Sequence, residues 1–407
     1  MTVTVGDLSF IGGAVLLGTG SAVAVAGLSL LGLAIASFAY REPLFGPAPR
    51  TRLVVLVPAH NEEALIGRCL ASLRAQIYPQ SLVSVVVVAD NCTDNTAWLA
   101  HQAGAEVLIR HDPRRRGKGH ALRWAMDQMT GAARPDAFVV VDADSVADPR
   151  LLAGLASMYE TGAEAAQAEY LVSSDDESSP RVRLRAAAFL LFHRVRFAGR
   201  AALGLPCSLV GNGMLFAGDL IERHPWDAFT GAEDLEYSVK LRLAGVRPVF
   251  AGSALVRGPV PASRRAAQRQ RERWEGGRLH VVRTSLPTVL RRIAHGQLAL
   301  ADLAVDLATP PLGLLATLSA GGATLAVGLW SAGLTSAWTV LPWVAAALAV
   351  AGYVVLGLRA AGAPARVYLD LLSAPRFLVE KLLGTAGVLR SRPAEMWVRT
   401  ERPNERG

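Results

Sequence analysis

Asp136-Ala137-Phe138-Val139-Val140-Val141-Asp142-Ala143-Asp144-Ser145 combines a short apolar run with two acids. Four consecutive apolar residues, three of them β-branched, predict a buried strand of a parallel sheet. Asp142 and Asp144 then follow at its C-terminal end, where open α/β sheets bind their ligands. If the chain stays extended, both carboxylates point the same way and could converge on one hard cation such as Mg²⁺. Taken alone, the pattern more often marks two solvated acids at the start of a loop.

The composition indicates membrane segments. The chain has 407 residues, of which 51% are hydrophobic, and this is too apolar for an ordinary soluble enzyme of its size. The net charge of +8 suits an anionic membrane surface or a phosphate-bearing substrate. Three cysteines without paired or metal-type spacing fit a reducing compartment and no disulfide framework.

The first long apolar run extends from Leu8 to Tyr40 without a charged residue. It exceeds the roughly 20 residues that one crossing needs. No basic region precedes it and no cleavage pattern follows, so we expect an anchor over residues 1–42 and not a signal peptide. Arginines follow the run and Asp7 precedes it, which places the next domain in the cytoplasm by the positive-inside rule. The alternative is a glycine-rich hairpin that enters the membrane and returns.

A second uncharged run extends from Leu307 to Leu358 and is interrupted near residues 330–338. It is too long for one helix, and tryptophans flank the interruption, so we expect two crossings at about 309–330 and 338–358. Arg359 and Arg366 then lie on the cytoplasmic side, as two crossings require. We expect residues 291–407 to form a C-terminal membrane region.

Between these runs, strands alternate with helices, which predicts an α/β domain over residues 50–290 with a largely parallel sheet. The first strand is predicted at Arg52–Pro58 and the second at Val83–Ala89, with a helix at Ala64–Gln76 between them. A basic amphipathic helix is predicted at Arg181–Gly199. It suits either the membrane face or an ordinary protein core.

Polar side chains follow the first two strands. Asn61 and Glu62 lie in the turn after the first strand, and Asp90 follows the second. Carboxyl ends of neighbouring parallel strands meet at one edge, so these residues are candidates for ligand binding. Ordinary turn chemistry explains the same residues equally well.

Lys118 stands between two glycines in a basic loop that opens a helix at Ala121–Met129. A lysine at a helix start can reach phosphate oxygens with the helix dipole assisting. The loop is not a Walker A motif, because the required glycine and hydroxyl residue are missing. A solvated basic turn is the alternative.

Two later helices carry further candidates. Glu233 and Asp234 begin a helix that runs to Leu243, where acids can also serve merely as partners of the helix dipole. Gln270, Arg273 and Trp274 stand at i, i+3 and i+4 of a basic helix, so they share one face. An amide, a guanidinium and an indole on one face suit a diphosphate and a sugar. The alternative is a basic helix lying along anionic lipid.

Four signatures thus occur in a fixed order: Val57–Glu62, Asp142-Ala143-Asp144, Glu233-Asp234 and Gln270-x-x-Arg273-Trp274. With them the chain resembles the membrane-bound family-two glycosyltransferases, the group of cellulose, chitin, hyaluronan and poly-N-acetylglucosamine synthases. The resemblance covers about Leu53 to Trp274 and the membrane layout. It implies a cytoplasmic GT-A domain of Rossmann-like α/β fold, held in the inner cell membrane by N- and C-terminal transmembrane helices. It also implies an interfacial helix at about 365–390.

The resemblance implies a role for each candidate residue. Asn61, Glu62 and Asp90 would contact the base and ribose of a nucleotide sugar, and Lys118 would lie near the nucleotide. Asp142 would bind the nucleotide side and share a Mg²⁺ or Mn²⁺ ion with Asp144. Asp234 would be the catalytic base, with Glu233 beside it in the substrate site. Gln270, Arg273 and Trp274 would cradle the diphosphate and the acceptor sugar.

The function implied is inverting transfer of a sugar, favouring a UDP-sugar donor, onto a growing polysaccharide in a processive manner. Two departures stand out: Ala89 and Ala232 occupy positions where many relatives carry Asp and Thr. About three crossings are fewer than cellulose synthase has, so single transfer to a membrane lipid acceptor is the alternative. An inert scaffold would have no need of Asp142, Asp144, Asp234 and Arg273 together. A transporter fits least, because no charged residue interrupts the two long apolar runs, where a substrate path would need one. No nucleic acid partner is expected, and the oligomeric state stays open.

Overall fold

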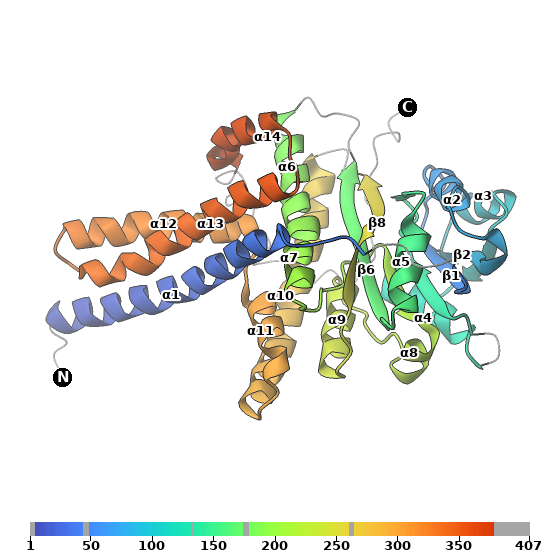
Figure 1. Ribbon diagram of the computed structural model, residues 1–407, viewed down its shortest axis with the longest axis horizontal. Helices are drawn as coiled ribbons and strands as arrows, with labels where there is room; N and C mark the ends of the chain where they lie inside the picture. The colour runs from blue at the N-terminus through green and yellow to red at the C-terminus, as the bar shows by residue number, and fades with distance from the viewer. Residues whose placement is uncertain (1–4, 44–48, 132–133, 174–178, 260–263, 378–407) are drawn as a thin grey trace. The chain divides into compact units, whose positions relative to one another are not determined.

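The computed structural model describes residues 5–43, 49–131, 134–173, 179–259 and 264–377 (Figure 1). The chain divides into two compact units. Of the described residues, those within 41–176 and 205–300 form one unit, the α/β unit, and those within 1–40, 177–204 and 301–377 form the other, the helical unit. The α/β unit is therefore built from chain segments that alternate with those of the helical unit.

An eight-stranded mixed sheet forms the centre of the α/β unit, with strand order β3-β2-β1-β4-β7-β6-β8-β5. Strands β1 to β4 are mutually parallel where they pair, and β6 is parallel to β8. The strand bounds are β1 Leu53–Ala59, β2 Val83–Asp90, β3 Glu106–Arg110, β4 Ala137–Val140, β5 Val146–Ala147, β6 Ala165–Ser173, β7 Met214–Ala217 and β8 Val249–Pro259.

The expectation of a largely parallel sheet holds for six of the eight strands, because β6 and β8 run in the same direction as β1 to β4. Strand β7 is antiparallel to both β4 and β6, and β5 is antiparallel to β8. The connection from β6 to β7 leaves the α/β unit through residues 177–204 and returns, so strand direction there is not set by a short βαβ crossover. The prediction of an α/β GT-A-type fold is confirmed, with a mixed sheet.

Helices cover both faces of the sheet, as the continuous apolar strands require. Strand β1 alternates between two cores: Val55 and Val57 face one, and Leu56 faces the other. The first core includes helices α2 (Ile66–Arg74) and α5 (Leu151–Glu160), and the second includes α4 (Lys118–Asp127) and α9 (Glu233–Leu243). The remaining helices of this unit are α3 Thr96–Gln102, α8 Gly218–Arg223 and α10 Arg264–Ala294.

Three helices of the helical unit are long and apolar enough to cross a membrane: Gly12–Ser37, Leu312–Ser331 and Ala337–Ala360. The first lies within one unbroken helix, α1 (Val5–Ser37), so the alternative of a hairpin is wrong. Helix α12 (Leu312–Ser331) and helix α13 (Leu341–Ala360) follow near the predicted bounds. The predicted segment 365–390 begins with α14 (Ala365–Asp370), and its part beyond residue 377 lies outside the described residues.

Helices α1, α12 and α13 pack against one another (Figure 1), and small residues allow their close approach. Trp343 of α13 donates from Nε1 to the Leu16 carbonyl of α1 at 3.0 Å. A Cβ added at Gly20 would stand 2.6 Å from Trp343, and one added at Gly322 of α12 would stand 2.0 Å from it. Trp343 therefore fits between two glycines, which is the close packing that membrane helices use.

The predicted helix Arg181–Gly199 belongs to the helical unit, as α6 (Pro180–Leu190), a π turn and α7 (Arg196–Ala202). Gly199 packs on the backbone of Leu33 in α1, where a Cβ would come within 2.1 Å of the carbonyl oxygen. Arg196 and Arg200 form buried ion pairs with acids of α11 (Ala301–Ala308). The basic face of this helix is thus partly occupied by protein carboxylates.

Candidate active site

The two acids after β4 lie at the carboxyl edge of the parallel half of the sheet. Asp142 accepts a hydrogen bond on Oδ1 from Lys118 Nζ at 2.5 Å. Asp144 accepts one on Oδ1 from the hydroxyl of Ser145 at 3.1 Å. The side chain of Asp142 remains 31% exposed, so its carboxylate is accessible to a ligand.

Lys118 is the first residue of α4, three residues earlier than the predicted helix start. Its ammonium donates to Asp142 and to the carbonyl oxygen of Gly211. Burial alone would lower the pKa of Lys118, but Asp142, Glu233 and Asp234 outweigh it and raise the pKa. Lys118 is therefore a fixed positive charge among carboxylates and not the solvated basic turn of the alternative interpretation.

Glycine at 119 allows this close arrangement. A Cβ there would lie 2.1 Å from the carbonyl oxygen of Ala228, in the segment that leads to α9. The start of α4 and the approach to α9 thus touch through their backbones. This contact brings Lys118 toward the acids of α9.

Asp234 stands in the first turn of α9, where its Oδ1 accepts the Leu235 N–H at 2.7 Å. Burial, followed by the charge of Glu233, raises the pKa of Asp234 to about 7. A Cβ added at Gly211 would stand 3.0 Å from Asp234 Oδ2 and 3.6 Å from Lys118 Nζ. Asp142, Lys118 and Asp234 therefore gather around the backbone of Gly211.

The helix with the Gln-x-x-Arg-Trp signature packs beside α9. In α10 a Cβ at Gly277 would come within 2.7 Å of the Ala232 N atom, and a Cβ at Gly231 would stand 3.4 Å from Arg273 Cγ. Arg273 consequently lies against the residues that precede Glu233. Trp274 is 38% exposed, and Gln270 precedes it by one turn. The sequence predicts this basic helix at Arg264–Arg283, and in the structure α10 extends further, to Ala294.

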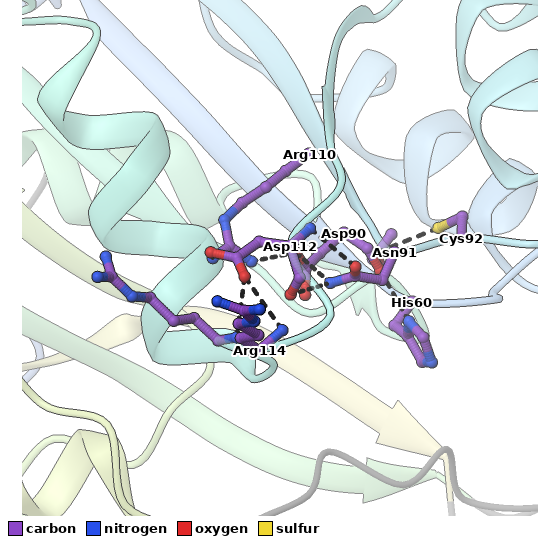
Figure 2. Close-up of polar contacts among 9 residues, drawn as sticks. His60, Asp90, Asn91, Cys92, Arg110, Asp112 and Arg114 are labelled. Carbon is purple, nitrogen blue, oxygen red and sulfur yellow. Dashed lines mark hydrogen bonds and ion pairs between the residues drawn. The ribbon is translucent and has the colours of Figure 1, made fainter.

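A second polar cluster lies where β2 and β3 end (Figure 2). Asp90 is only 1% exposed, and its Oδ1 accepts bonds from Arg110 at 2.5 Å and from Asn91 at 3.0 Å. Its Oδ2 is buried without a hydrogen-bond partner among the described residues. Arg110 also pairs with Asp112 at 3.0 Å. A donor from a bound nucleoside would satisfy the remaining oxygen of Asp90.

The loop with Asn61 and Glu62 is tied to the loop that follows β2. Asn61 adopts a φ of +55°, which Asn tolerates better than most residues. Its Oδ1 accepts the Thr93 N–H at 2.7 Å, and the Glu62 N–H donates to Thr96 Oγ1 at 2.8 Å. Both predicted residues thus lie close to Asp90 in the fold, and Asn61 uses its carbonyl to hold the loop.

The donor set after β4 fits a divalent cation. Among the described residues, no three acids, histidines or cysteines gather as a complete metal site. Mg²⁺ commonly takes one or two carboxylates and completes its shell with water and substrate phosphates. Asp142 and Asp144 supply such hard oxygen donors, and the ammonium of Lys118 lies beside Asp142.

Residues 49–277 match the family model described as glycosyltransferase like family 2. The chain belongs to this family. Among curated relatives, it is 24% identical over 242 residues to the probable glycosyltransferase YdaM of Bacillus subtilis, covering 57% of this chain and 56% of YdaM. It is 27% identical over 290 residues to an N-acetylglucosaminyltransferase of Rhizobium meliloti, covering 64% and 66%. The chain thus spans little more than half of YdaM.

Among solved structures, this family-two chain is similar to the mannosyltransferase PcManGT from Pyrobaculum calidifontis, in complex with GDP-Man and Mn²⁺. The match has a TM-score of 0.52 at 21% identity and covers 85% of this chain and 97% of the mannosyltransferase. At this identity the likeness establishes the fold.

Some residues that hold the site together are not among those predicted from the sequence. Arg110 comes from β3, a strand absent from the predicted elements, although Val107-Leu108-Ile109 is an apolar run of the kind that strands contain. Gly277 was also missed. Two glycines in the middle of a helix are unfavourable by about 1 kcal/mol each relative to Ala, so the pair Gly276-Gly277 could have suggested a close helix contact.

Proposed function

We propose that the protein is a metal-dependent, inverting glycosyltransferase that transfers a sugar from a UDP-sugar onto a growing polysaccharide in a processive manner. The observation that carries the proposal is the convergence of Lys118, Asp142 and Asp234 around Gly211. At the edge of the sheet this arrangement brings together a carboxylate that can act as a base (Asp234), an ammonium group (Lys118) and a carboxylate that can bind a metal ion (Asp142). Arg273, on the helix packed against Gly231, adds positive charge and supports the assignment.

Asp234 serves as the general base in this proposal. A sugar hydroxyl is a poor nucleophile near neutral pH, and a positioned base contributes on the order of 10²–10⁴ in rate. A carboxylate whose pKa is about 7 accepts a proton more readily than an ordinary aspartate. Asp234 Oδ2 takes the proton of the acceptor hydroxyl as the acceptor oxygen bonds to the sugar and the bond from the sugar to the diphosphate breaks. Burial, followed by the charge of Glu233, raises the pKa of Asp234, so the carboxylate holds this proton more firmly.

The other residues bind and orient the donor. Asp142 and Asp144 would hold Mg²⁺ or Mn²⁺, which neutralises charge on the leaving diphosphate when bound. The positive charges of Lys118 and Arg273 also stabilise the negative charge on the leaving diphosphate. Asp90, Asn61 and Glu62 bind the nucleoside, while Gln270 and Trp274 face the acceptor sugar.

The relatives support parts of this proposal. The mannosyltransferase PcManGT is described with GDP-Man and Mn²⁺, and a curated relative is an N-acetylglucosaminyltransferase. Both descriptions concern hexose transfer, and the first pairs a nucleotide sugar with a divalent cation. Membership of the group of cellulose, chitin, hyaluronan and poly-N-acetylglucosamine synthases is part of the proposal, and it rests on the Gln270-x-x-Arg273-Trp274 signature.

The proposal includes the membrane. Residues 1–42 form an anchor, residues 50–290 form the cytoplasmic catalytic domain, and residues 291–407 form the C-terminal membrane region of an inner-membrane protein. Three helices long and apolar enough to cross a bilayer support this layout. The arginines that follow the first helix support the cytoplasmic side for the catalytic domain.

One observation favours a second candidate, single transfer to a membrane lipid acceptor. Within the described residues only three helices qualify as membrane spans, few for a chain that would also export a polymer. A lipid acceptor needs no such path because its reactive end already lies at the membrane surface.

Product analysis separates the two candidates. The full chain in lipid nanodiscs would be incubated with Mn²⁺ and labelled UDP- and GDP-sugars, with Asp234→Asn as the inactive control. A polymer whose length grows with time supports processive synthesis, and a single species that extracts with lipid supports the second candidate. No incorporation from any donor, with or without added lipid acceptors, contradicts both.

A further inference from the structure

A buried amide links the two acids that follow β4. Asn212 lies just before β7 and is 0% exposed. Its Oδ1 accepts the backbone N–H of Asp142 at 3.1 Å, and its Nδ2 donates to Ser145 Oγ at 2.8 Å. The Ser145 hydroxyl in turn donates to Asp144 Oδ1 at 3.1 Å. One side chain therefore contacts the turn 142–145 at both ends.

The direction of these hydrogen bonds is fixed by elementary chemistry. A backbone N–H can only donate, so the atom of Asn212 that faces Asp142 must be the oxygen, and the amide nitrogen must face Ser145. Because that nitrogen donates, the Ser145 oxygen accepts and keeps its single proton for Asp144. The chain of bonds thus delivers a donor to the carboxylate of Asp144.

Asn212 is itself held firmly. Gln167 is also 0% exposed. Its Nε2 donates to the backbone carbonyl of Asn212 at 2.7 Å, and its Oε1 accepts a hydrogen bond from the Val210 N–H at 3.0 Å. On the other side Gly213 has a φ of +68°, and a Cβ there would stand 2.9 Å from side chains of β6 and β8. The backbone around the amide therefore has little freedom to move away from the turn.

We propose that Asn212, acting through Ser145, is a positioning residue that fixes Asp142 and Asp144 for the divalent cation of the donor complex. The inference rests on the proposed function, because it assigns the cation to these two acids. Neither Asn212 nor Ser145 touches the reacting atoms. Their contribution is to hold one backbone N–H and one carboxylate in a single arrangement before the cation binds. Residues that orient metal ligands in this way typically change metal affinity or activity by 10–100-fold when removed.

The test measures Mn²⁺ binding without turnover. Manganese would be titrated into the full chain in detergent with UDP present, and free Mn²⁺ would be followed by electron paramagnetic resonance. Ser145→Ala and Asn212→Ala are each expected to raise the Kd for Mn²⁺ by about 10- to 100-fold. Ser145→Thr, which keeps the hydroxyl, is expected to bind as the unsubstituted protein does.

Tyr78→Phe is the matched control. It removes one buried side-chain hydrogen bond, from Tyr78 Oη to the Thr51 carbonyl at 2.8 Å, before the amino end of β1 and away from the acids. It is expected to lower Tm without changing the Kd for Mn²⁺. In turnover assays Ser145→Ala should need more Mn²⁺ for half-maximal rate and should recover most of kcat at saturating Mn²⁺. A merely structural role would lower Tm in both variants and leave the Mn²⁺ requirement unchanged.

The double variant adds an independent check. Because Asn212 acts through Ser145, the two substitutions together should raise the Kd by less than the product of the single effects. Unchanged Mn²⁺ affinity in a folded Ser145→Ala variant overturns the inference and leaves the proposed function standing. Failure of the unsubstituted protein to bind Mn²⁺ with either UDP or GDP overturns both. If Asn212→Ala does not fold, the Ser145 variants alone decide.

Discussion

Asp234 is buried beside Glu233, and these two effects raise its pKa to about 7, although the Leu235 N–H at the helix N-terminus acts in the opposite direction. A general base works only when deprotonated, so activity should rise with pH through about 7 and then level off. One pH unit below the pKa, about a tenth of the base is ionised, and the rate should fall in proportion. The measurement is kcat/KM against pH, since this ratio reports groups of the free enzyme. A profile flat from pH 5 to 8 would contradict the assignment.

Removing the base tests the same residue directly. Asp234→Asn keeps the shape of the side chain and eliminates its ability to take a proton. We expect transfer to fall by on the order of 10²–10⁴ while the Kd for UDP with Mn²⁺ stays nearly unchanged. Retained turnover in this variant would exclude Asp234 as the base.

The Asp90–Arg110 pair makes a prediction about stability. Both side chains are buried, at 1% and 6% exposure, so Arg110→Ala leaves an uncompensated carboxylate inside the protein. Breaking a buried pair in this way typically costs about 3–5 kcal/mol. Arg52→Ala is the matched control, because its pair with Asp136 is largely exposed and such pairs contribute about 0–1 kcal/mol. Thermal unfolding should show a clearly lower Tm for the first variant only, and equal Tm values would refute the buried-pair argument.

For single residues, the sequence predicts those positions that depend on nearby residues in the chain. The position of Asp142 and Asp144 after an apolar run, and of Glu233 and Asp234 at a helix start, follows from local pattern. The partner of Asp90 does not, because Arg110 comes from another strand and nothing near residue 90 points to it. The link from Asn212 to Ser145 is equally distant along the chain and depends on β7 pairing with β4.

At the scale of helices, the contact of α10 with the start of α9 should be essential for activity. Gly277→Ala would place a Cβ 2.7 Å from Ala232 N, so α10 must shift and carry Arg273 away from Gly231. We expect kcat to fall by about 10-fold or more, as misplaced catalytic groups typically do. Gly276→Ala is the matched control, since a Cβ there meets nothing within 4 Å and should stabilise the helix slightly. Equal kcat values for the two variants would argue against this contact.

Strand direction marks the limit of sequence analysis for the elements. Alternating strands and helices correctly predict the parallel half of the sheet, where short helical crossovers connect β1, β2, β3 and β4. Strand β7 follows a long connection that belongs to the helical unit. No local sequence pattern predicts whether such a strand is parallel or antiparallel to its neighbours. The basic helix predicted at Arg264–Arg283 also ended too early. Beyond it, Leu286, Val289, Leu290 and Ile293 continue a helical spacing, and α10 runs on through Pro287 to Ala294.

For the whole molecule, the proposed topology places the turn between α12 and α13 outside and α14 inside. Ser336→Cys, in that turn, should react with a membrane-impermeant maleimide in intact cells. Ala365→Cys, at the start of α14, should react only after permeabilisation. Both positions are exposed, so access and not burial decides the outcome. Labelling of Ala365→Cys in intact cells would reverse the proposed orientation.

The insertion of Trp343 between Gly20 and Gly322 has a consequence for biogenesis. Trp343 bonds to Leu16, 327 positions earlier in the chain, and the residues of the α/β unit up to 300 are synthesised before α12 and α13 exist. During translation the groove at Gly20 therefore stays unfilled until the ribosome has passed residue 343. Until then the part of α1 around Gly20 must be covered by lipid or by the insertion machinery, although Gly199 of α7 can already pack on Leu33 of α1. A nascent chain stalled at residue 300 should thus hold α1 in contact with α7 but without α12 and α13, and it is the best point at which to trap assembly factors.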